Sequence, residues 1–258
     1  MIELVNVTQH YGVRPVLKNI NIRVEQGELV VIVGPNGMGK TTILGVMGGA
    51  LQPQHGQVYI DNKLRRLSVE TELQIRKKSV YLPDQAWLPS LRTGREFLLS
   101  VGQLYEIPTD RLMEHVDRLI DLFDLMKQGD WAISSYSSGQ KKNIALASAL
   151  VTEVPILLLD EPFSGGLDPS GLLALKRVLA RRVEEGATVV LTSPVPEIVE
   201  EIADRIVVLK MGEVAAFDTL DGLRELTGCD GSLTDMLEQL MFPETTHKLE
   251  DYFKELPR

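Results

Sequence analysis

One short stretch of this sequence constrains the fold more than any other, because it joins a phosphate-binding motif to a strand and a helix. Five apolar residues, 29 to 33, predict a buried strand, and a helix with apolar periodicity follows the motif. The motif has the form G-x-x-x-x-G-K-[ST], and its residues are Gly34, Pro35, Asn36, Gly37, Met38, Gly39, Lys40, Thr41 and Thr42. Its glycines let backbone N–H groups surround an anion, and the helix N-terminus adds partial positive charge at the same point. We expect Lys40 to reach nucleotide β- and γ-phosphates and the Thr41 hydroxyl to bind Mg²⁺, the alternative being an ordinary glycine-rich turn.

Length and composition limit the class of protein. With 258 residues and 44% apolar content, the chain can form one large domain or two lobes around a sizeable core. No apolar run approaches the roughly 20 residues of a membrane span. The N-terminus, with Glu3 early, does not have the order of a signal peptide. The single cysteine, Cys229, cannot form a disulfide within the chain and is typical of a reducing cytoplasm.

Charge and metal-binding residue types argue against two functions. The chain has 36 acidic and 27 basic residues, and its net charge of -9 argues against non-specific nucleic-acid binding, although a local basic patch stays compatible. The histidines are scattered and have no ligand spacing with Cys229, so we expect no zinc site.

Alternating strand and helix patterns predict an α/β fold. Residues 1 to 28 read as two strands joined around Tyr11-Gly12, and residues 56 to 61 read as a third. Short apolar runs predict further strands at 79–82, 156–159, 188–192 and 206–209. Helical periodicity dominates from Asp84 to about Val151 and returns from 171 to about 183. We therefore expect a mostly parallel sheet covered on both faces, with a helical block inserted at about 84–151.

The segment after Gly228 has the pattern of an appendage, which divides the chain into a main domain at 1–228 and a helical extension at 229–258. Ser232 and Asp235 form a capping-box-like helix start. The apolar face of the helix is Leu233, Met236, Leu237, Leu240 and Met241. Pro243 ends it, and a second amphipathic piece carries Leu249, Tyr252, Phe253 and Leu256. Both faces can pack on the core or bind a partner.

Two further motifs carry chemistry. The apolar run that starts after Pro155 ends in Asp160 and Glu161, and an open α/β sheet places ligand-binding groups at this end of its strands. Asp160 can hold Mg²⁺, and Glu161 can polarise an attacking water. Between this strand and the phosphate loop, residues 135 to 140 read Ser-Tyr-Ser-Ser-Gly-Gln before an apolar helix, which by itself is only a serine N-cap.

The three motifs in this order resemble the ATP-binding cassette (ABC) family, over roughly residues 1 to 228. The resemblance implies a P-loop NTPase core of the RecA-like type, with an N-terminal antiparallel β subdomain and an inserted helical subdomain. Residues 136 to 140 stand where the family has its signature motif, of which Ser137, Ser138, Gly139 and Gln140 are the candidate contacts in trans. The resemblance implies a head-to-tail dimer, homodimeric or heterodimeric, in which ATP held by one chain's P-loop is completed by the other chain's signature helix. It also makes Lys40 and Glu161 the catalytic residues and Tyr11 the aromatic that stacks on adenine, against the alternative of an ordinary hairpin tyrosine.

The chain departs from the family pattern at four places. Where the family usually has a glutamine that contacts Mg²⁺, this chain has Asp84 followed by Gln85, and either can serve as a ligand. The third signature position is Ser138 rather than glycine. The loop after Glu161, residues 163 to 169, has one glycine more than expected.

The fourth departure concerns the switch histidine that contacts the γ-phosphate. Counting from the following Ala-Asp-Arg places Pro194 there, and proline has neither a side-chain donor nor an N–H. Ser193 is a weak substitute at best. We expect weakened hydrolysis on this ground.

The resemblance implies the ATP-binding subunit of an ABC transporter of the single-cassette export type. Such a subunit uses ATP and Mg²⁺, lies peripherally on the cytoplasmic face of the membrane, and works with transmembrane permease subunits. We expect the region after Asp84, including Trp87, Leu88, Leu91 and Arg95, to receive a coupling helix from the permease. The alternatives are a nucleotide-binding regulator or degenerate half of a heterodimer, and a soluble cassette ATPase that acts outside transport.

Overall fold

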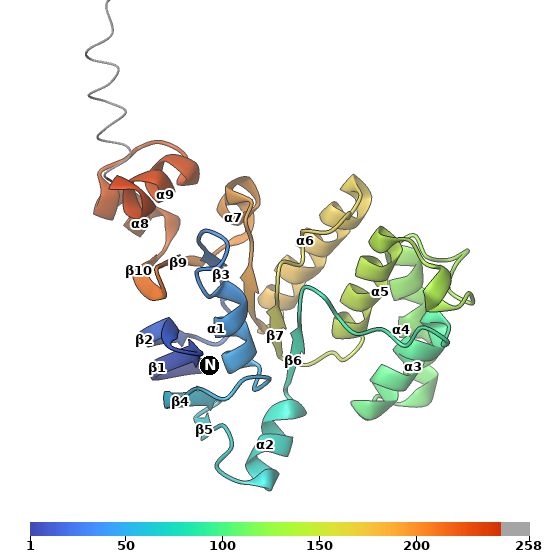
Figure 1. Ribbon diagram of the computed structural model, residues 1–258. Coiled ribbons are helices and arrows are strands. Elements are labelled where there is room, and N and C mark those ends of the chain that lie inside the picture. The colour runs from blue at the N-terminus through green and yellow to red at the C-terminus, as the bar shows by residue number, and fades with distance from the viewer. Residues whose placement is uncertain (244–258) are drawn as a thin grey trace, which may run out of the picture.

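The computed structural model describes residues 1–243, arranged as two β-sheets with helices around them (Figure 1). One sheet has four strands in the order β2-β1-β4-β5, and the other has six in the order β10-β9-β3-β8-β7-β6. The strands are β1 (Ile2–Tyr11), β2 (Arg14–Val24), β3 (Leu29–Val33), β4 (His55–Ile60), β5 (Lys63–Leu64), β6 (Ser79–Leu82), β7 (Ile156–Leu159), β8 (Thr188–Thr192), β9 (Arg205–Lys210) and β10 (Glu213–Asp218).

The helices lie mostly between consecutive strands of the larger sheet. They are α1 (Lys40–Met47), α2 (Val69–Arg76), α3 (Gly94–Leu104), α4 (Thr109–Leu122), α5 (Ser138–Leu150), α6 (Pro169–Glu184), α7 (Pro196–Ile202), α8 (Leu220–Thr227) and α9 (Leu233–Met241), with a 3-10 turn at Ile133–Ser135. Among residues 1–243, no helix has the length and apolar character needed to cross a membrane.

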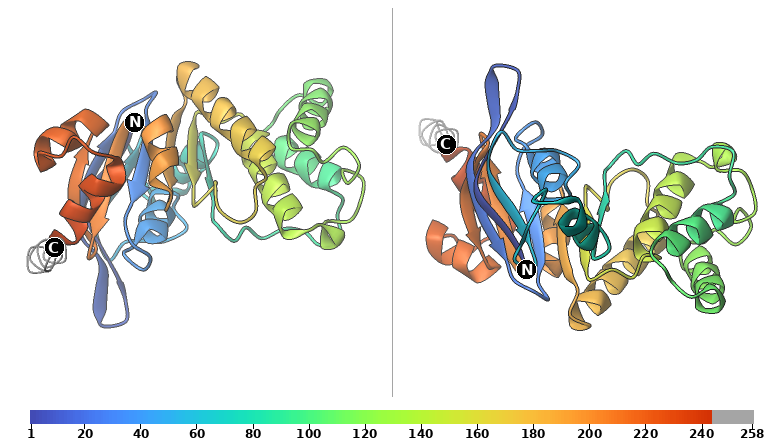
Figure 2. Two further views of the ribbon diagram at one scale, coloured as in Figure 1. Left: turned by 90° about the horizontal axis from the view of Figure 1, so that it is seen from above. Right: turned by 90° about the horizontal axis from the view of Figure 1, so that it is seen from below.

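The N-terminal sheet is antiparallel, as the sequence predicts. In β1, Ile2 pairs with Val24 of β2 on one side and with Ile60 of β4 on the other. The turn between β1 and β2 contains Gly12 at φ 73°, a left-handed conformation that glycine adopts without a Cβ clash. Figure 2 shows this hairpin projecting away from the rest of the fold.

The larger sheet is parallel from β9 to β6, and only β10 pairs antiparallel at its edge. All five residues of β3 are buried because successive side chains enter different cores on the two faces. Leu29, Val31 and Val33 join one core, while Val30 and Ile32 join the other. Since parallel strands end at the same edge, the loops after β3, β7 and β8 come together there, which makes this edge the place for a site.

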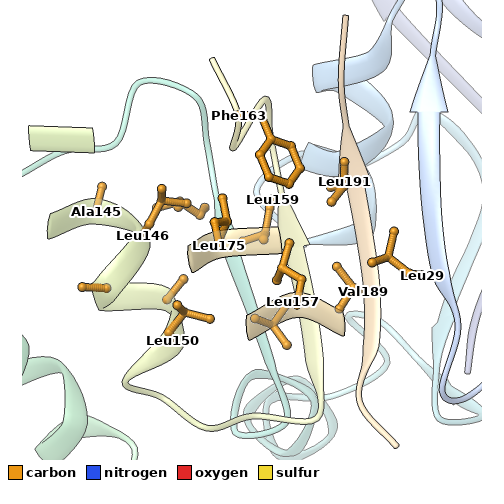
Figure 3. Packing of buried hydrophobic residues seen from close by; sticks show 14 of the residues in the cluster. Leu29, Ala145, Leu146, Leu150, Leu157, Leu159, Phe163, Leu175, Val189 and Leu191 are labelled. Carbon is orange, nitrogen blue, oxygen red and sulfur yellow. The ribbon is translucent and has the colours of Figure 1, made fainter. Parts of the chain in front are cut away.

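The helices α3, α4 and α5 form a block between β6 and β7 that lies to one side of the sheet (Figure 1). Figure 3 shows Ala145, Leu146 and Leu150 of α5 beside Leu175 of α6 and Leu157 of β7. These residues belong to one continuous buried cluster. The packing fixes α5 relative to β7, and so relative to the residues that follow β7.

The predicted C-terminal helix is α9, and Ser232 caps it with the expected capping box. Leu233, Met236 and Leu237 are buried in the core cluster. The Leu233 N–H donates to Glu200 of α7, and the Lys210 ammonium donates to the Leu240 carbonyl at 3.0 Å. The apolar face of α9 therefore packs on the core, and the second amphipathic piece predicted around 249–256 lies outside the described residues.

The sequence analysis did not predict α2, β5, α7, β10 or α8. Mixed polar and apolar residues make α2 and α8, and β5 has only two residues. These elements depend on tertiary contacts more than on local periodicity.

Candidate functional site

The phosphate loop between β3 and α1 has the backbone that its glycines predict. Gly37 and Gly39 have φ of 79° and 101°, in the left-handed region. A Cβ on Gly39 would lie 2.7 Å from Leu17 Cδ2, and one on Gly34 would lie 2.5 Å from the Leu209 carbonyl oxygen. The loop is thus pressed against β2 and β9 so closely that glycine is required at both positions.

Lys40 lies folded under this loop. Its ammonium donates to the Gly34 carbonyl at 2.8 Å and lies 3.4 Å from both the Pro35 carbonyl and Asn36 Oδ1. Burial lowers the pKa of Lys40, while the carboxylates of Glu161 and Asp160 raise it. The loop thus brings a cation together with the two acids that the sequence singles out after β7.

Asp160 follows β7 directly and is 1% exposed. Its Oδ1 accepts a hydrogen bond from Thr192 Oγ1 at 2.7 Å. Its Oδ2 is buried and has no hydrogen-bond partner in the described part of the chain. A buried carboxylate oxygen without a donor is expensive to leave unpaired, and it is the type of ligand that Mg²⁺ prefers. The site therefore fits a magnesium ion.

Glu161 has a strained backbone that is held at both of its polar groups. Its φ is 44°, which is uncommon for a residue with a side chain. Its N–H donates to Thr192 Oγ1 at 2.7 Å, and its carbonyl accepts from Lys142 Nζ and Ser164 Oγ, each at 2.9 Å. Strain of this kind persists only where the surroundings fix it, and it is often found in active sites.

The signature segment starts α5 and is open to solvent. Ser137 is the N-cap, and it forms a capping box with Gln140: Ser137 Oγ accepts from the Gln140 N–H at 3.3 Å, and Gln140 Oε1 accepts from the Ser137 N–H at 2.9 Å. Ser137 and Ser138 are both exposed. The three views of Figures 1 and 2 place α5 far from α1, with β7 and α6 between them. The exposed first turn of α5 therefore belongs to a helix that lies apart from the phosphate loop of its own chain.

Comparison with known proteins identifies the family. Residues 17–164 match the family model described as ABC transporter. The chain is 33% identical over 222 residues to the daunorubicin resistance ATP-binding protein DrrA3 of Streptomyces coeruleorubidus, covering 86% of this chain and 69% of that protein. This chain belongs to the ABC transporter ATP-binding family.

Solved structures agree with this assignment. The structure titled as the ATP-binding subunit of an ABC transporter has a TM-score of 0.86 at 27% identity, covering 93% of this chain and 99% of that one. The cassette MJ0796, solved as a dimer in a post-hydrolysis state with ADP and Pi, has a TM-score of 0.76 at 30% identity, covering 85% of this chain and 99% of that one. The predicted fold class is confirmed, and the chain is a cassette that binds and hydrolyses ATP.

The cassette differs from its family pattern after β6, where Asp84 and Gln85 follow the strand. Asp84 Oδ1 accepts from Lys142 Nζ at 3.1 Å and from Ser164 Oγ at 3.2 Å. Its carboxylate is therefore paired within the chain, and a role for Asp84 or Gln85 as a magnesium ligand stays a prediction. Sequence reasoning missed Lys142, because a lysine on a helix usually indicates a solvated face.

The longer loop after Glu161 contacts the signature. A Cβ on Gly139 would lie 2.7 Å from the Gly166 carbonyl oxygen, and Gly166 itself has φ of 95°. The extra glycine therefore allows the loop backbone to pack directly against the first turn of α5. The loop therefore has a close packing contact with the signature helix despite its additional glycine.

The switch position after β8 has no side-chain donor. Pro194 is exposed, whereas Ser193 is buried and its Oγ accepts from the Val195 N–H at 3.1 Å. Ser193 is thus directed into its own turn and is poorly placed to replace a histidine. Pro194 borders a pocket of about 350 Å³ that the phosphate loop and α9 also line, with Asn36 and Leu237 among the lining residues.

Tyr11 ends β1 and is mostly exposed, at 56%. Burial, together with the charges of Asp160 and Tyr11, raises the pKa of Tyr81 on β6 to about 12. The stacking of Tyr11 on adenine stays a prediction.

Thr192 is a second residue of the site that sequence reasoning missed. Its hydroxyl donates to Asp160 and accepts from the Glu161 N–H, so it links both acids. In the sequence, Thr192 is marked only as a threonine at the end of an apolar strand. Its role beside the two acids can be predicted only when β8 is known to pair with β7.

Proposed function

We propose that this cassette drives transport through a separate membrane permease, working as one of two cassettes paired head to tail around MgATP. The observation that carries this proposal is the exposed N-terminal turn of α5, a helix that lies apart from α1 and the phosphate loop of its own chain. A helix N-terminus binds anions, and a second copy or a close relative would supply one in the form of its bound nucleotide. The similar cassette MJ0796 was solved as a dimer with ADP and Pi, which supports a function as a pair of cassettes.

Within one chain, the P-loop residues 34 to 42 would hold the phosphates. Lys40 would leave the Gly34 carbonyl for the β- and γ-phosphates, which place a stronger acceptor at the same ammonium. Thr41 and the free Oδ2 of Asp160 would hold Mg²⁺. The ion, when bound, would neutralise charge on the phosphate oxygens.

Glu161 would polarise the water that attacks the γ-phosphate, while Ser137, Ser138 and Gly139 of the opposite chain close the site. With Pro194 at the switch position, one donor to the γ-phosphate is missing, so hydrolysis would be slow. Hydrolysis would then release the nucleotide that joins the two subunits.

Two exposed apolar side chains support a permease contact near the segment after β6. Trp87 is 82% exposed and Leu91 is 90% exposed, which is unusual for residues of this size and marks a surface that a partner can cover. Leu88 packs against the core beside them, and Arg95 is paired with Asp130 at 2.9 Å. This surface would place the cassette on the cytoplasmic face of the membrane. The name of the daunorubicin resistance relative favours export.

One alternative has an observation of its own. Pro194 also suits the degenerate half of a heterodimer, in which an intact partner site performs the hydrolysis. Steady-state ATP turnover by this chain alone distinguishes a slow but active cassette from a degenerate half. A homodimer of degenerate halves would bind ATP and release almost no phosphate.

The test is steady-state phosphate release by the full chain, with Glu161→Gln as the inactive reference. Slow turnover that Glu161→Gln abolishes supports the proposal, and turnover unchanged by Glu161→Gln contradicts the role of Glu161.

For the permease contact, the test is sedimentation. The native protein should sediment with membranes, and replacing Trp87 and Leu91 by alanine should release it. Met211→Ala is the matched control, since Met211 is 66% exposed on the turn between β9 and β10. If the variant with both alanines still sediments with membranes, Trp87 and Leu91 do not form the permease contact.

A further inference from the structure

Lys142 lies where three functional segments of the cassette meet. It belongs to the signature helix α5, and its side chain is only 8% exposed. Its ammonium donates to Asp84 Oδ1 in the segment after β6 at 3.1 Å, and to the backbone carbonyl of Glu161 after β7 at 2.9 Å. Ser164 of the following loop shares both acceptors, at 3.2 Å from Asp84 Oδ1 and 2.9 Å from the Glu161 carbonyl. A buried lysine with two such acceptors connects these segments through charge-assisted hydrogen bonds.

The carbonyl that Lys142 holds belongs to a strained residue. Glu161 has φ of 44°, and a non-glycine residue keeps a left-handed backbone only when its neighbours fix it. The Thr192 hydroxyl fixes the Glu161 N–H on one side. Lys142 and Ser164 fix the carbonyl on the other, and Lys142 is the only one of the three that carries a charge. Removing it would leave the Glu161 carbonyl held by Ser164 alone, through its hydroxyl at 2.9 Å and its N–H at 3.1 Å, and would fix the direction of the carboxylate less firmly.

Asp84 explains why a buried lysine is tolerated at this place. Its carboxylate balances the ammonium, and it stands where the family pattern has a neutral glutamine. The acid after β6 and the lysine on α5 therefore belong together as a pair.

We propose that Lys142 is a positioning residue, which holds the Glu161 backbone so that its carboxylate faces the attacking water. Lys142 lies on the same helix as Ser137 and Gly139, which would contact the partner's nucleotide. It would therefore couple that contact to the position of Glu161 in its own chain. This inference rests on the proposed role of Glu161 in hydrolysis.

The test compares Lys142→Met with wild type in steady-state ATP hydrolysis by the full chain. We expect kcat to fall roughly 10- to 100-fold and the KM for MgATP to stay within about twofold, because positioning of the reacting group is lost while binding is kept. Lys142→Arg should restore most of kcat, since it keeps the charge and donors, and a pocket of about 320 Å³ beside Lys142 has room for the guanidinium. Lys142→Gln, which keeps a polar donor without charge, replaces the methionine variant if that variant does not fold.

The matched control is Lys176→Met, which removes a mostly buried lysine of α6 that pairs with Glu201 of α7 at 2.5 Å. It should leave kcat unchanged even where it lowers thermal stability. Wild-type kcat in Lys142→Met and Lys142→Gln would overturn the inference, and so would a kcat loss that Lys142→Arg does not repair. The same assay distinguishes a failure of the proposed function. If Glu161 has no role in hydrolysis, the Glu161→Gln variant keeps wild-type turnover, whatever the result for the Lys142 variants.

Discussion

The hydroxyl of Thr192 donates a hydrogen bond of 2.7 Å to Oδ1 of Asp160. It joins the last residue of β8 to the acid that follows β7, two strands that pair in parallel with Leu159 opposite Leu191. The same hydroxyl accepts from the Glu161 N–H, so one side chain orients the candidate magnesium ligand and the candidate catalytic acid together. Because the bond occupies Oδ1, the free Oδ2 is the oxygen left for the metal.

Thr192→Val tests what the hydroxyl contributes to stability and to hydrolysis, because valine has nearly the same shape and lacks the hydroxyl. It leaves Asp160 Oδ1 and the Glu161 N–H without their partner, which should lower the free energy of unfolding by about 1 to 3 kcal/mol. It should also lower kcat roughly 10-fold or more by releasing both acids. Urea unfolding and phosphate release measure the two quantities.

Thr188→Val is the control on the same strand. Thr188 is buried, and its hydroxyl accepts from the Gly27 N–H at 3.1 Å, at the end of β8 remote from the site. It should cost about 1 kcal/mol of stability without lowering kcat. If both valine variants lower kcat equally, the link between Thr192 and the acids has no special role in hydrolysis.

Pro194→His should speed a slow ATPase. A histidine there would border the pocket beside Asn36 and supply the missing donor to the γ-phosphate. We expect kcat to rise roughly 10-fold or more, in line with the value of one transition-state donor in other enzymes. Pro194→Ala is the control, since it removes the proline ring and adds no side-chain donor. An equal gain in both variants would assign the effect to the backbone, and no gain in either would mean that the site already compensates.

Gly139→Ala tests the contact between the signature and the longer loop after Glu161. Its Cβ would lie 2.7 Å from the Gly166 carbonyl oxygen, so the loop backbone must shift. We expect weaker ATP-dependent dimerisation, measured by size-exclusion chromatography in a Glu161→Gln background. Ser138→Gly, which places the family's glycine at the exposed neighbouring position and creates no clash, should not weaken dimerisation. Normal dimerisation of Gly139→Ala would show that the loop moves without consequence.

The nucleotide-holding half of the site could be predicted from the sequence because its motifs are local. A few neighbouring residues are enough to predict the phosphate loop from Gly34 to Lys40. The same is true of the apolar strand before Asp160. β3, β6, β7 and β8 follow for the same reason, since buried parallel strands are continuous apolar runs.

The groups that orient the catalytic acid could not be predicted, because they depend on strand order and helix docking. β3 pairs with β8 and β9, which come much later in the chain. Nothing local to Thr192 shows that β7 lies beside β8. Lys142 looks like a solvated helix residue until α5 is docked on β7 and α6, which buries it beside Asp84.

Tyr81 gives the cassette an alkaline sensitivity with a defined sign. Burial, followed by the charges of Asp160 and Tyr11, raises the pKa of its phenol to about 12, above the value of about 10 in an unfolded chain. A raised folded pKa means that the stabilising contribution is complete below about pH 10 and is lost as the pH rises through about 12. Wild type should therefore lose about 1 to 2 kcal/mol more than Tyr81→Phe over this interval, since phenylalanine cannot ionise.

Urea unfolding at pH 8 and at pH 11 to 12 measures the difference, and only the gap between the two proteins counts, because other groups titrate there as well. Tyr59→Phe is the matched control: its hydroxyl donates to Gln57 at 2.7 Å on the antiparallel sheet, away from Asp160. It should keep the wild-type loss of stability. Parallel pH curves for wild type and Tyr81→Phe would mean that the phenol ionises as easily when folded as when unfolded, and that its burial against the nucleotide site carries no electrostatic cost.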